Sequence, residues 1–134
     1  MPSKSSTIAK PATRTGRATA RTNRPSRGSQ HPVQGVNEAL RSCIDECNRT
    51  LAYCIQQGGY HTDPAHLFSL MDCVEVCITT ADLVGRDSPL QDGLLSLCAS
   101  ACKACEESCE TFEDDATMRS CADACRQAYR ACIP

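Results

Sequence analysis

Four cysteines in the segment CASACKACEESC, residues 98–109, restrict the fold of this chain more than any other feature. They are Cys98, Cys102, Cys105 and Cys109, so successive cysteines lie four, three and four residues apart. With about 3.6 residues per turn, this spacing places all four thiols along one face of an α-helix. The chain has 12 cysteines in 134 residues, and the remaining ones repeat this spacing elsewhere. They are Cys43, Cys47, Cys54, Cys73, Cys77, Cys121, Cys125 and Cys132.

Glycine and proline residues mark the ends of the first two predicted helices. The first helix is expected over residues 32–57 and ends before Gly58 and Gly59, because glycine readily takes the left-handed conformation that ends a helix. The second is expected to begin at Asp63 and Pro64, an N-cap residue followed by proline at the first helical position. It should end near Gly85.

Two more helices follow the same kind of signal. The sequence SPLQ, from Ser88 to Gln91, predicts a capping box at the start of a third helix that runs to about Phe112. Asp114 or Asp115 is expected to cap a fourth helix that lasts to the C-terminus. Connections this short make successive helices antiparallel. We therefore predict an all-α, up-down-up-down four-helix bundle over residues 32–134.

Residues 1–31 differ in composition from the rest of the chain. The first 32 residues contain seven lysines and arginines and no acidic residue, whereas all 16 acidic residues follow. Few large apolar side chains are present, so burial cannot offset the entropy lost on ordering, and we predict a disordered basic tail. Because no aromatic residues are interleaved with the arginines, an address peptide or a plain solvated tail is favoured over a nucleic-acid-binding arm.

The hydropathy pattern bears on the compartment and on the use of the cysteines. No apolar run approaches the roughly 18 residues of a membrane span, and no apolar segment resembles that of a secretory signal. We therefore expect a cytoplasmic protein without a membrane span. In such a compartment, a high density of cysteine indicates metal binding more often than a disulfide framework.

The spacing of the cysteines favours monovalent copper. Five pairs have the C-x-x-x-C spacing, and on a helix their Cβ atoms lie about 5–6 Å apart, too far for an easy disulfide. Two sulfurs on opposite sides of one ion would lie about 4.6 Å apart, and thiolates are the ligands that Cu(I) prefers. All 12 cysteines fall where the core-facing positions of the four helices are expected. We predict a column of Cu(I) sites along the bundle axis.

Four other uses of the cysteines compete with this one. Buried free cysteines can act as small apolar residues. Structural zinc usually takes C-x-x-C pairs on turns, and iron–sulfur clusters take other spacings, so neither fits well. A disulfide-linked hairpin of twin C-x-x-x-C helices, used as a chaperone or adaptor, is the main alternative, with Cys43 and Cys47 facing Cys73 and Cys77. Cys54 and Cys132, however, belong to no such pair.

Two further candidate ligands lie at one end of the predicted bundle. His66 is one heptad before Cys73 on the same helix face, and Met118 is three residues before Cys121. Imidazole and thioether are both copper ligands. We therefore expect copper to enter at this end, although ordinary packing of Met118 and a helix-end role for His66 are equally compatible with the sequence. His61, in the loop, is a weaker candidate.

The second helix carries an additional apolar face. Leu67, Met71, Val74 and Ile78 recur at spacings of four, three and four residues, and Met71 lies far around the helix from the cysteines. A bundle helix that is apolar on two faces usually has a second partner. We predict a homo-oligomer that packs through this helix.

Several segments together resemble the bacterial copper storage proteins. They are QGGYHTDPAHLFSLMDCVEVC, SPLQ, CASACKACEESCE and CADAC, and the resemblance covers about residues 32–134. It implies a cysteine-lined four-helix bundle, typically tetrameric, that stores and detoxifies Cu(I). It also implies that copper is admitted at the end that holds His66 and Met118. It also implies the cytosolic type, which lacks a twin-arginine signal, with a copper chaperone as a candidate partner.

The chain departs from the cysteine-richest members of that family. Thr50, Thr80 and Ala128 occupy positions on the cysteine faces, so a lower copper capacity is expected. No nucleophile–base arrangement, phosphate-binding loop or open metal site is legible in the sequence, and we expect no enzymatic activity.

Overall fold

Short turns set the order of four long helices. The computed structural model describes residues 27–134, with side chains from residue 33 onward. The helices are α1 (Arg27–Gln57), α2 (Pro64–Gly85), α3 (Gln91–Glu110) and α4 (Ala116–Cys132), with a 3-10 helix, η1 (Gly59–Thr62), between α1 and α2. Residues 1–26 of the predicted tail lie outside the described part, and α1 begins at Arg27, ahead of the predicted start at residue 32.

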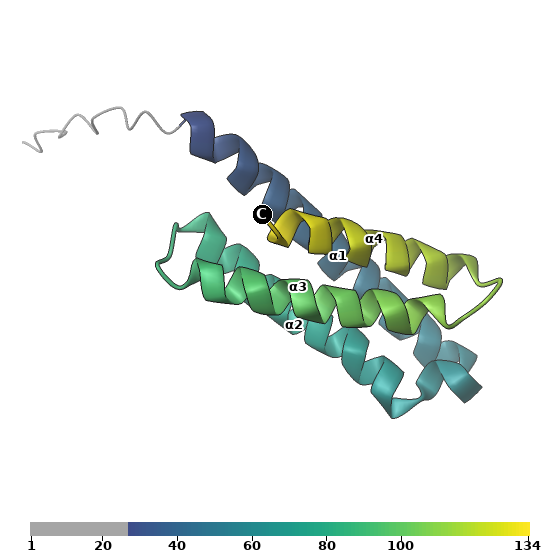
Figure 1. The fold of residues 1–134 in the computed structure, drawn as a ribbon. Coiled ribbons are helices and arrows are strands. Elements are labelled where there is room, and N and C mark those ends of the chain that lie inside the picture. Colours follow the sequence, from purple (N-terminus) through teal and green to yellow (C-terminus); the bar gives the residue numbers. More distant parts are fainter. Residues whose placement is uncertain (1–26) are drawn as a thin grey trace, which may run out of the picture.

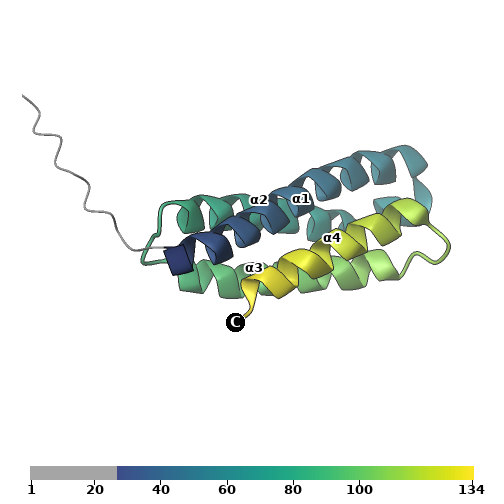
Figure 2. The same ribbon diagram turned by 90° about the horizontal axis from the view of Figure 1, so that it is seen from above.

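The helices form the predicted antiparallel bundle. Contacts join α1 to α2, α2 to α3, α3 to α4 and α4 back to α1, which is a square arrangement around one axis. Figures 1 and 2 show the four helices side by side, each running opposite to the next. The loop from α1 to α2 and the loop from α3 to α4 therefore lie at one end of the bundle, and the α2–α3 loop lies at the other. Among residues 27–134, no helix is both long and apolar enough to cross a membrane.

Most of the predicted helix ends are confirmed. α1 ends at Gln57, and Gly58 and Gly59 follow with φ of 69° and 57°, in the left-handed region that glycine tolerates. α2 begins at Pro64 and ends at Gly85, although the side chain of Asp63 makes no capping hydrogen bond. Asp115 caps α4, because its carboxylate accepts hydrogen bonds from the backbone N–H groups of Thr117 and Met118.

The predicted capping box at Ser88 is wrong. α3 begins at Gln91, without a side-chain cap, and ends at Glu110 rather than near Phe112. The backbone N–H of Ser88, which a capping box would give to Gln91, donates instead to the carbonyl of Leu83 at 2.9 Å. The side chain of Gln91 donates to Asp87 at 3.1 Å.

The outer apolar face of α2 is also narrower than predicted. Met71 and Ile78 are 42% and 44% exposed, and Phe68 beside them is exposed as well. Val74, predicted to share this face, is only 9% exposed, because α2 packs against both α1 and α3 and its neighbours cover this side chain. The core holds the cysteines, with Leu40, Leu70, Ala81 and Ala122 packed around them.

Candidate metal centre

All 12 cysteines turn toward the bundle axis. Each is buried, and each is a free thiol. Nine of them have another cysteine sulfur 3.6–4.0 Å away, on the same helix or on a neighbouring one. The core-facing positions that usually carry leucine and isoleucine therefore carry sulfur, and the predicted thiol column is confirmed as an arrangement of side chains.

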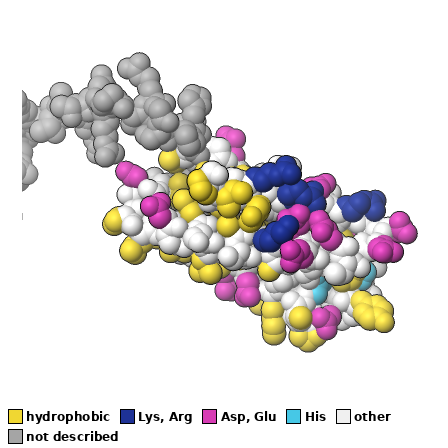
Figure 3. Space-filling view, viewed as in Figure 1, with side chains coloured by type: hydrophobic (Ala, Val, Ile, Leu, Met, Phe, Trp, Pro, Cys, Tyr) yellow, Lys and Arg dark blue, Asp and Glu magenta, His cyan; other side chains and the backbone are white. Residues whose placement is uncertain are grey.

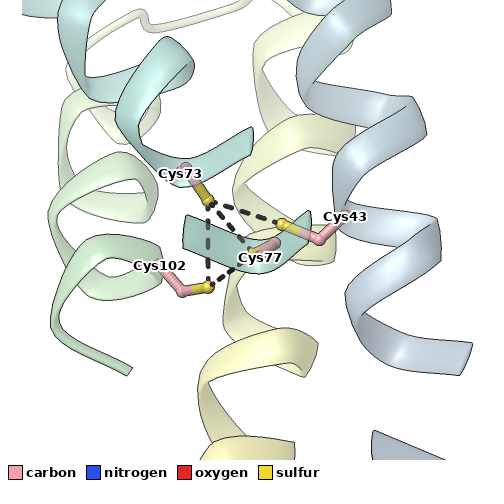
Figure 4. A group of neighbouring side chains, drawn as sticks. All are labelled: Cys43, Cys73, Cys77 and Cys102. Carbon is pink, nitrogen blue, oxygen red and sulfur yellow. Dashed lines mark hydrogen bonds between the residues drawn. The ribbon is translucent and has the colours of Figure 1, made fainter. Parts of the chain in front are cut away.

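Three groups of four sulfurs can each surround an ion. In each group all the sulfur atoms lie within 4.8 Å of one another. Figure 4 shows the first, in which Cys73 and Cys77 of α2 meet Cys43 of α1 and Cys102 of α3. The second joins Cys43, Cys47, Cys73 and Cys125, and the third joins Cys47, Cys105, Cys121 and Cys125.

The groups share sulfurs, and this sharing bears on the kind of metal. Cys43 and Cys73 belong to the first and second groups, and Cys47 and Cys125 belong to the second and third. Separate tetrahedral ions would compete for these atoms, since structural zinc takes four ligands of its own. A soft ion of low coordination number can use shared thiolates, as Cu(I) does. The sulfurs are closer than the roughly 4.6 Å of a collinear S–metal–S unit, so bent or three-sulfur coordination suits this geometry better.

The disulfide-linked hairpin is not observed. Cys43 of α1 does face Cys73 of α2, as that alternative required, but their sulfurs are 3.6 Å apart. A disulfide needs about 2.05 Å. Cys43 also contacts Cys47 and Cys125, so its sulfur is one member of a network rather than half of a pair.

Cys54, His66 and Met118 meet at one end of the column, and we call them the entrance group. The His66 Nε2 atom lies 3.4 Å from the Cys54 sulfur, and the Met118 sulfur lies 3.7 Å from it. Ser108 Oγ lies 2.7 Å from His66 Nδ1, where it can accept a hydrogen bond from Nδ1–H and leave Nε2 free to bind a metal. The sequence prediction that His66 and Met118 share one end is confirmed by their positions, and Cys54 joins them there.

His61 does not join this group. Its Nε2 atom lies 2.8 Å from the Asp115 carboxylate, and its ring packs against Phe112 with centroids 4.5 Å apart. The weaker of the two candidate histidines thus holds the surrounding loops rather than facing a sulfur.

Burial sets the protonation of the entrance group. It lowers the pKa of His66, which keeps the imidazole neutral and able to bind a metal. Burial also raises the pKa of Cys54 to about 11, with smaller contributions from Cys121 and Asp115, so this thiol keeps its proton until a metal replaces it.

Within the column, sulfur–sulfur hydrogen bonds shift the pKa values of the thiols in both directions. Hydrogen bonding with neighbouring thiols, Cys102 first, lowers the pKa of Cys73. The pKa of Cys125 is raised, with Cys105 the largest cause.

Three core-facing positions lack sulfur, as the sequence indicated. Thr50, Thr80 and Ala128 are all buried. Thr80 donates to the carbonyl of Val76 at 2.7 Å, whereas the hydroxyl of Thr50 has no hydrogen-bond partner among the described residues. These positions interrupt the sulfur faces of α1, α2 and α4.

Sequence reasoning missed a buried ion pair beside the column. Glu106 is only 4% exposed, although glutamate is rarely buried to this extent. Arg126 of α4 donates to it at 2.9 Å, and also to Glu110 and Asp123, each at 2.7 Å. No short-range pattern links Glu106 to a residue 20 positions later, so the pairing of α3 with α4 was needed to find it.

The chain resembles known proteins in sequence and in structure. The family model described as "Copper storage protein" matches residues 29–134. No curated protein sequence matches the chain. The crystal structure of the Nmul_A1745 protein from Nitrosospira multiformis is similar with a TM-score of 0.71 and 30% identity, covering 76% of this chain and 92% of that one.

Two further solved structures are similar. The Cu(I)-bound copper storage protein BsCsp3 has a TM-score of 0.71 and 25% identity, covering 75% of this chain and 94% of that one. Apo-Csp3 from Bacillus subtilis has a TM-score of 0.66 and 24% identity, covering 74% and 93%, and this match shows the fold alone.

Proposed function

The chain belongs to the copper storage protein family, and from this premise we propose how its own residues hold the metal. It binds and stores several Cu(I) ions through cysteine thiolates, a storage role rather than a catalytic one. The observation that carries this conclusion is the column of 12 buried free thiols, nine of which lie 3.6–4.0 Å from another cysteine sulfur.

We propose that all 12 cysteines serve as ligands. Shared sulfurs allow one thiolate to bridge two ions, so neighbouring groups can fill together without added ligands. The buried surroundings exclude water and strengthen the attraction between each ion and its thiolates. Thr50, Thr80 and Ala128 supply no soft ligand, which supports a smaller capacity than a fully cysteine-lined bundle would have.

An anaerobic Cu(I) titration against a competing chromophoric chelator tests this function directly. The reduced apo-protein should show 12 titratable thiols and should bind several Cu(I) ions per chain more tightly than the chelator does. Four or more native disulfides together with weak copper binding would contradict copper storage and support the disulfide-linked hairpin instead.

We also propose that the entrance group admits copper. His66 offers a neutral imidazole, Met118 a thioether, and both contact Cys54. His66→Ala should slow loading while the final copper content stays nearly unchanged, because the thiols beyond Cys54 remain. Stopped-flow mixing with Cu(I), followed by sulfur-to-copper absorbance, measures the rate. A loading rate equal to that of the wild type would remove the special role of this histidine.

The exposed apolar side chains of α2 support a homo-oligomer, with a tetramer favoured by the family resemblance. Met71 and Ile78 are both more than two-fifths exposed, and Phe68 adds to the same surface. Met71→Asp combined with Ile78→Asp should give monomers in sedimentation velocity. An oligomer that persists in this double variant would exclude the α2 face as the interface.

A further inference from the structure

The loops cover the axial end of the bundle above the entrance group. His61 of η1 and Asp115, which precedes α4, lie 2.8 Å apart and tie the two loops together across this end. The Tyr53 hydroxyl of α1 donates to the same carboxylate at 2.9 Å. Beneath this network, Cys54 and Met118 are fully buried. An ion that approaches along the axis therefore meets a closed, hydrogen-bonded surface.

A pocket between α2 and α3 approaches the same group from the side. It has a volume of about 670 Å³, and we call it the side pocket. His66 and Ser108 lie in its wall, whereas Cys54 and Met118 do not. Histidine atoms are visible at the surface at this end of the bundle in Figure 3. The remaining lining residues are Tyr60, Asp63, Ala65, Ser69, Ala104, Thr111 and Phe112.

The size and lining of the side pocket fit a small organic carrier better than a bare ion. Pockets of about 300–1,000 Å³ are typical of small-molecule sites. No lysine or arginine lines it, and Asp63 is its acidic residue, which favours a ligand with a positively charged group. Tyr60 and Phe112 offer apolar surface for the body of the ligand, and Ser69 and Ser108 offer hydroxyl groups.

We propose that the side pocket binds a small Cu(I)–aminothiol complex, such as Cu(I)–cysteine or a Cu(I)-bound cysteinyl peptide, and that copper enters the bundle sideways through His66. This proposal rests on the copper storage function proposed above. The ammonium group of the carrier pairs with Asp63, and its copper-bound thiolate lies at His66. The pocket then explains why His66 alone of the entrance group reaches a surface cavity.

Transfer is an exchange of ligands without a change in oxidation state. The copper forms a bond to His66 Nε2, and then one to the Cys54 sulfur 3.4 Å away. The bond between copper and the carrier sulfur breaks. The proton that Cys54 loses ends on the departing carrier thiolate, so a free thiol leaves and Cu(I) stays. Atoms and charge therefore balance without an oxidant or a reductant.

Filling the side pocket tests the route. Ala104 is an exposed residue of α3 in the pocket wall, and Ala104→Trp should obstruct the pocket without touching a sulfur. Anaerobic stopped-flow loading from Cu(I)–cysteine should become several-fold slower, with an unchanged final copper content. Ala52→Trp, at an exposed alanine of α1 outside the side pocket, is the matched control and should load at the wild-type rate.

Loosening the axial end tests the other route. Tyr53→Phe removes the hydroxyl that donates to Asp115. If copper enters through the side pocket, this variant loads at the wild-type rate. A faster rate in Tyr53→Phe, or a wild-type rate in Ala104→Trp, would overturn the side entry. If Ala104→Trp does not fold, Ala104→Gln obstructs the same wall with a smaller side chain and is judged by the same criteria.

The chemistry of the carrier is tested at Asp63. This side chain makes no capping hydrogen bond, so Asp63→Asn should leave α2 intact. The wild type should load faster from Cu(I)–cysteine than from Cu(I)–N-acetylcysteine, which lacks the ammonium group, and Asp63→Asn should reduce this preference. An unchanged preference would overturn the assigned carrier. A wild-type protein that takes up no copper from either complex would instead contradict the storage function.

Discussion

The two ends of the bundle are built from different interactions. At the end that holds the entrance group, Asp115, His61 and Tyr53 connect the loops through hydrogen bonds. Toward the opposite end, Leu40 of α1 and Val84 of α2 are buried aliphatic side chains. Aliphatic packing is costly to disrupt, whereas a few partly exposed hydrogen bonds open easily. The aliphatic end should therefore contribute more to the stability of the bundle than the end that holds the entrance group.

The largest expected effect on stability lies at the aliphatic end. Leu40 is fully buried, so Leu40→Ala should lower the free energy of unfolding of the apo-protein by about 3 kcal/mol. Because a leucine side chain offers no metal ligand, the copper content at saturation should not change. Urea denaturation and the anaerobic titration measure the two quantities. A loss of copper content in a variant that is still folded would show that this end is part of the store.

A substitution at the end that holds the entrance group should lower the free energy of unfolding by a smaller amount. Asp115→Ala removes the N-cap of α4 and the partner of His61 and Tyr53, and should cost about 1–2 kcal/mol. The same urea denaturation measures this cost. If Asp115→Ala costs as much as Leu40→Ala, the proposed difference between the ends is wrong.

The contribution of Asp115 to the stability of the folded protein should also depend on pH. Burial raises the pKa of its carboxyl group, but hydrogen bonds from His61, the Met118 N–H and Tyr53 outweigh burial, and the pKa is lowered. A depressed pKa gives stability that is present above the unfolded-state value of about 4 and is lost as the pH falls through the folded-state value. The stability difference between the wild type and Asp115→Asn should therefore shrink as the pH falls below about 5. A constant difference would show that the carboxylate charge contributes nothing.

The smallest effect on stability is expected for Met118→Leu. This change nearly conserves volume at a fully buried position, so it should cost less than about 1 kcal/mol. Because it removes the thioether beside Cys54, it should nevertheless slow copper loading in stopped-flow experiments. Leu40→Ala would then lower stability without lowering copper content, whereas Met118→Leu would slow loading with little loss of stability. A loading rate that does not change would reduce Met118 to a packing residue.

The thiol column could be predicted from sequence because a helix repeats regularly. Once Cys98, Cys102, Cys105 and Cys109 fall on one helix face, the antiparallel connections bring the other cysteines to the same axis. The placement of His66 and Met118 at one end followed from the same register, whereas their contacts with Cys54 were not predicted. Local periodicity and short loops were sufficient for these features.

The covering of the axial end could not be predicted in this way. Asp115 contacts His61 and Tyr53 at separations of 54 and 62 residues, and all three lie in loops or near the end of a helix. No periodic pattern sets such contacts. The capping box at Ser88 failed for a related reason, since the turn after α2 uses the backbone N–H that the box requires. The burial of Val74 likewise depended on how closely neighbouring helices approach α2.

The scarcity of charge inside the bundle governs what copper must displace. Among residues 33–134, Glu106 is the only buried carboxylate, and Arg126 already balances it. No other buried acidic group can neutralise an entering cation, and an uncompensated charge in such an interior is costly. Each Cu(I) must therefore displace a thiol proton as it binds. Filling the column is an exchange of copper for hydrogen ions, which leave on the departing carrier thiol or, when Cu(I) arrives without such a carrier, in the solvent. Acid therefore favours emptying.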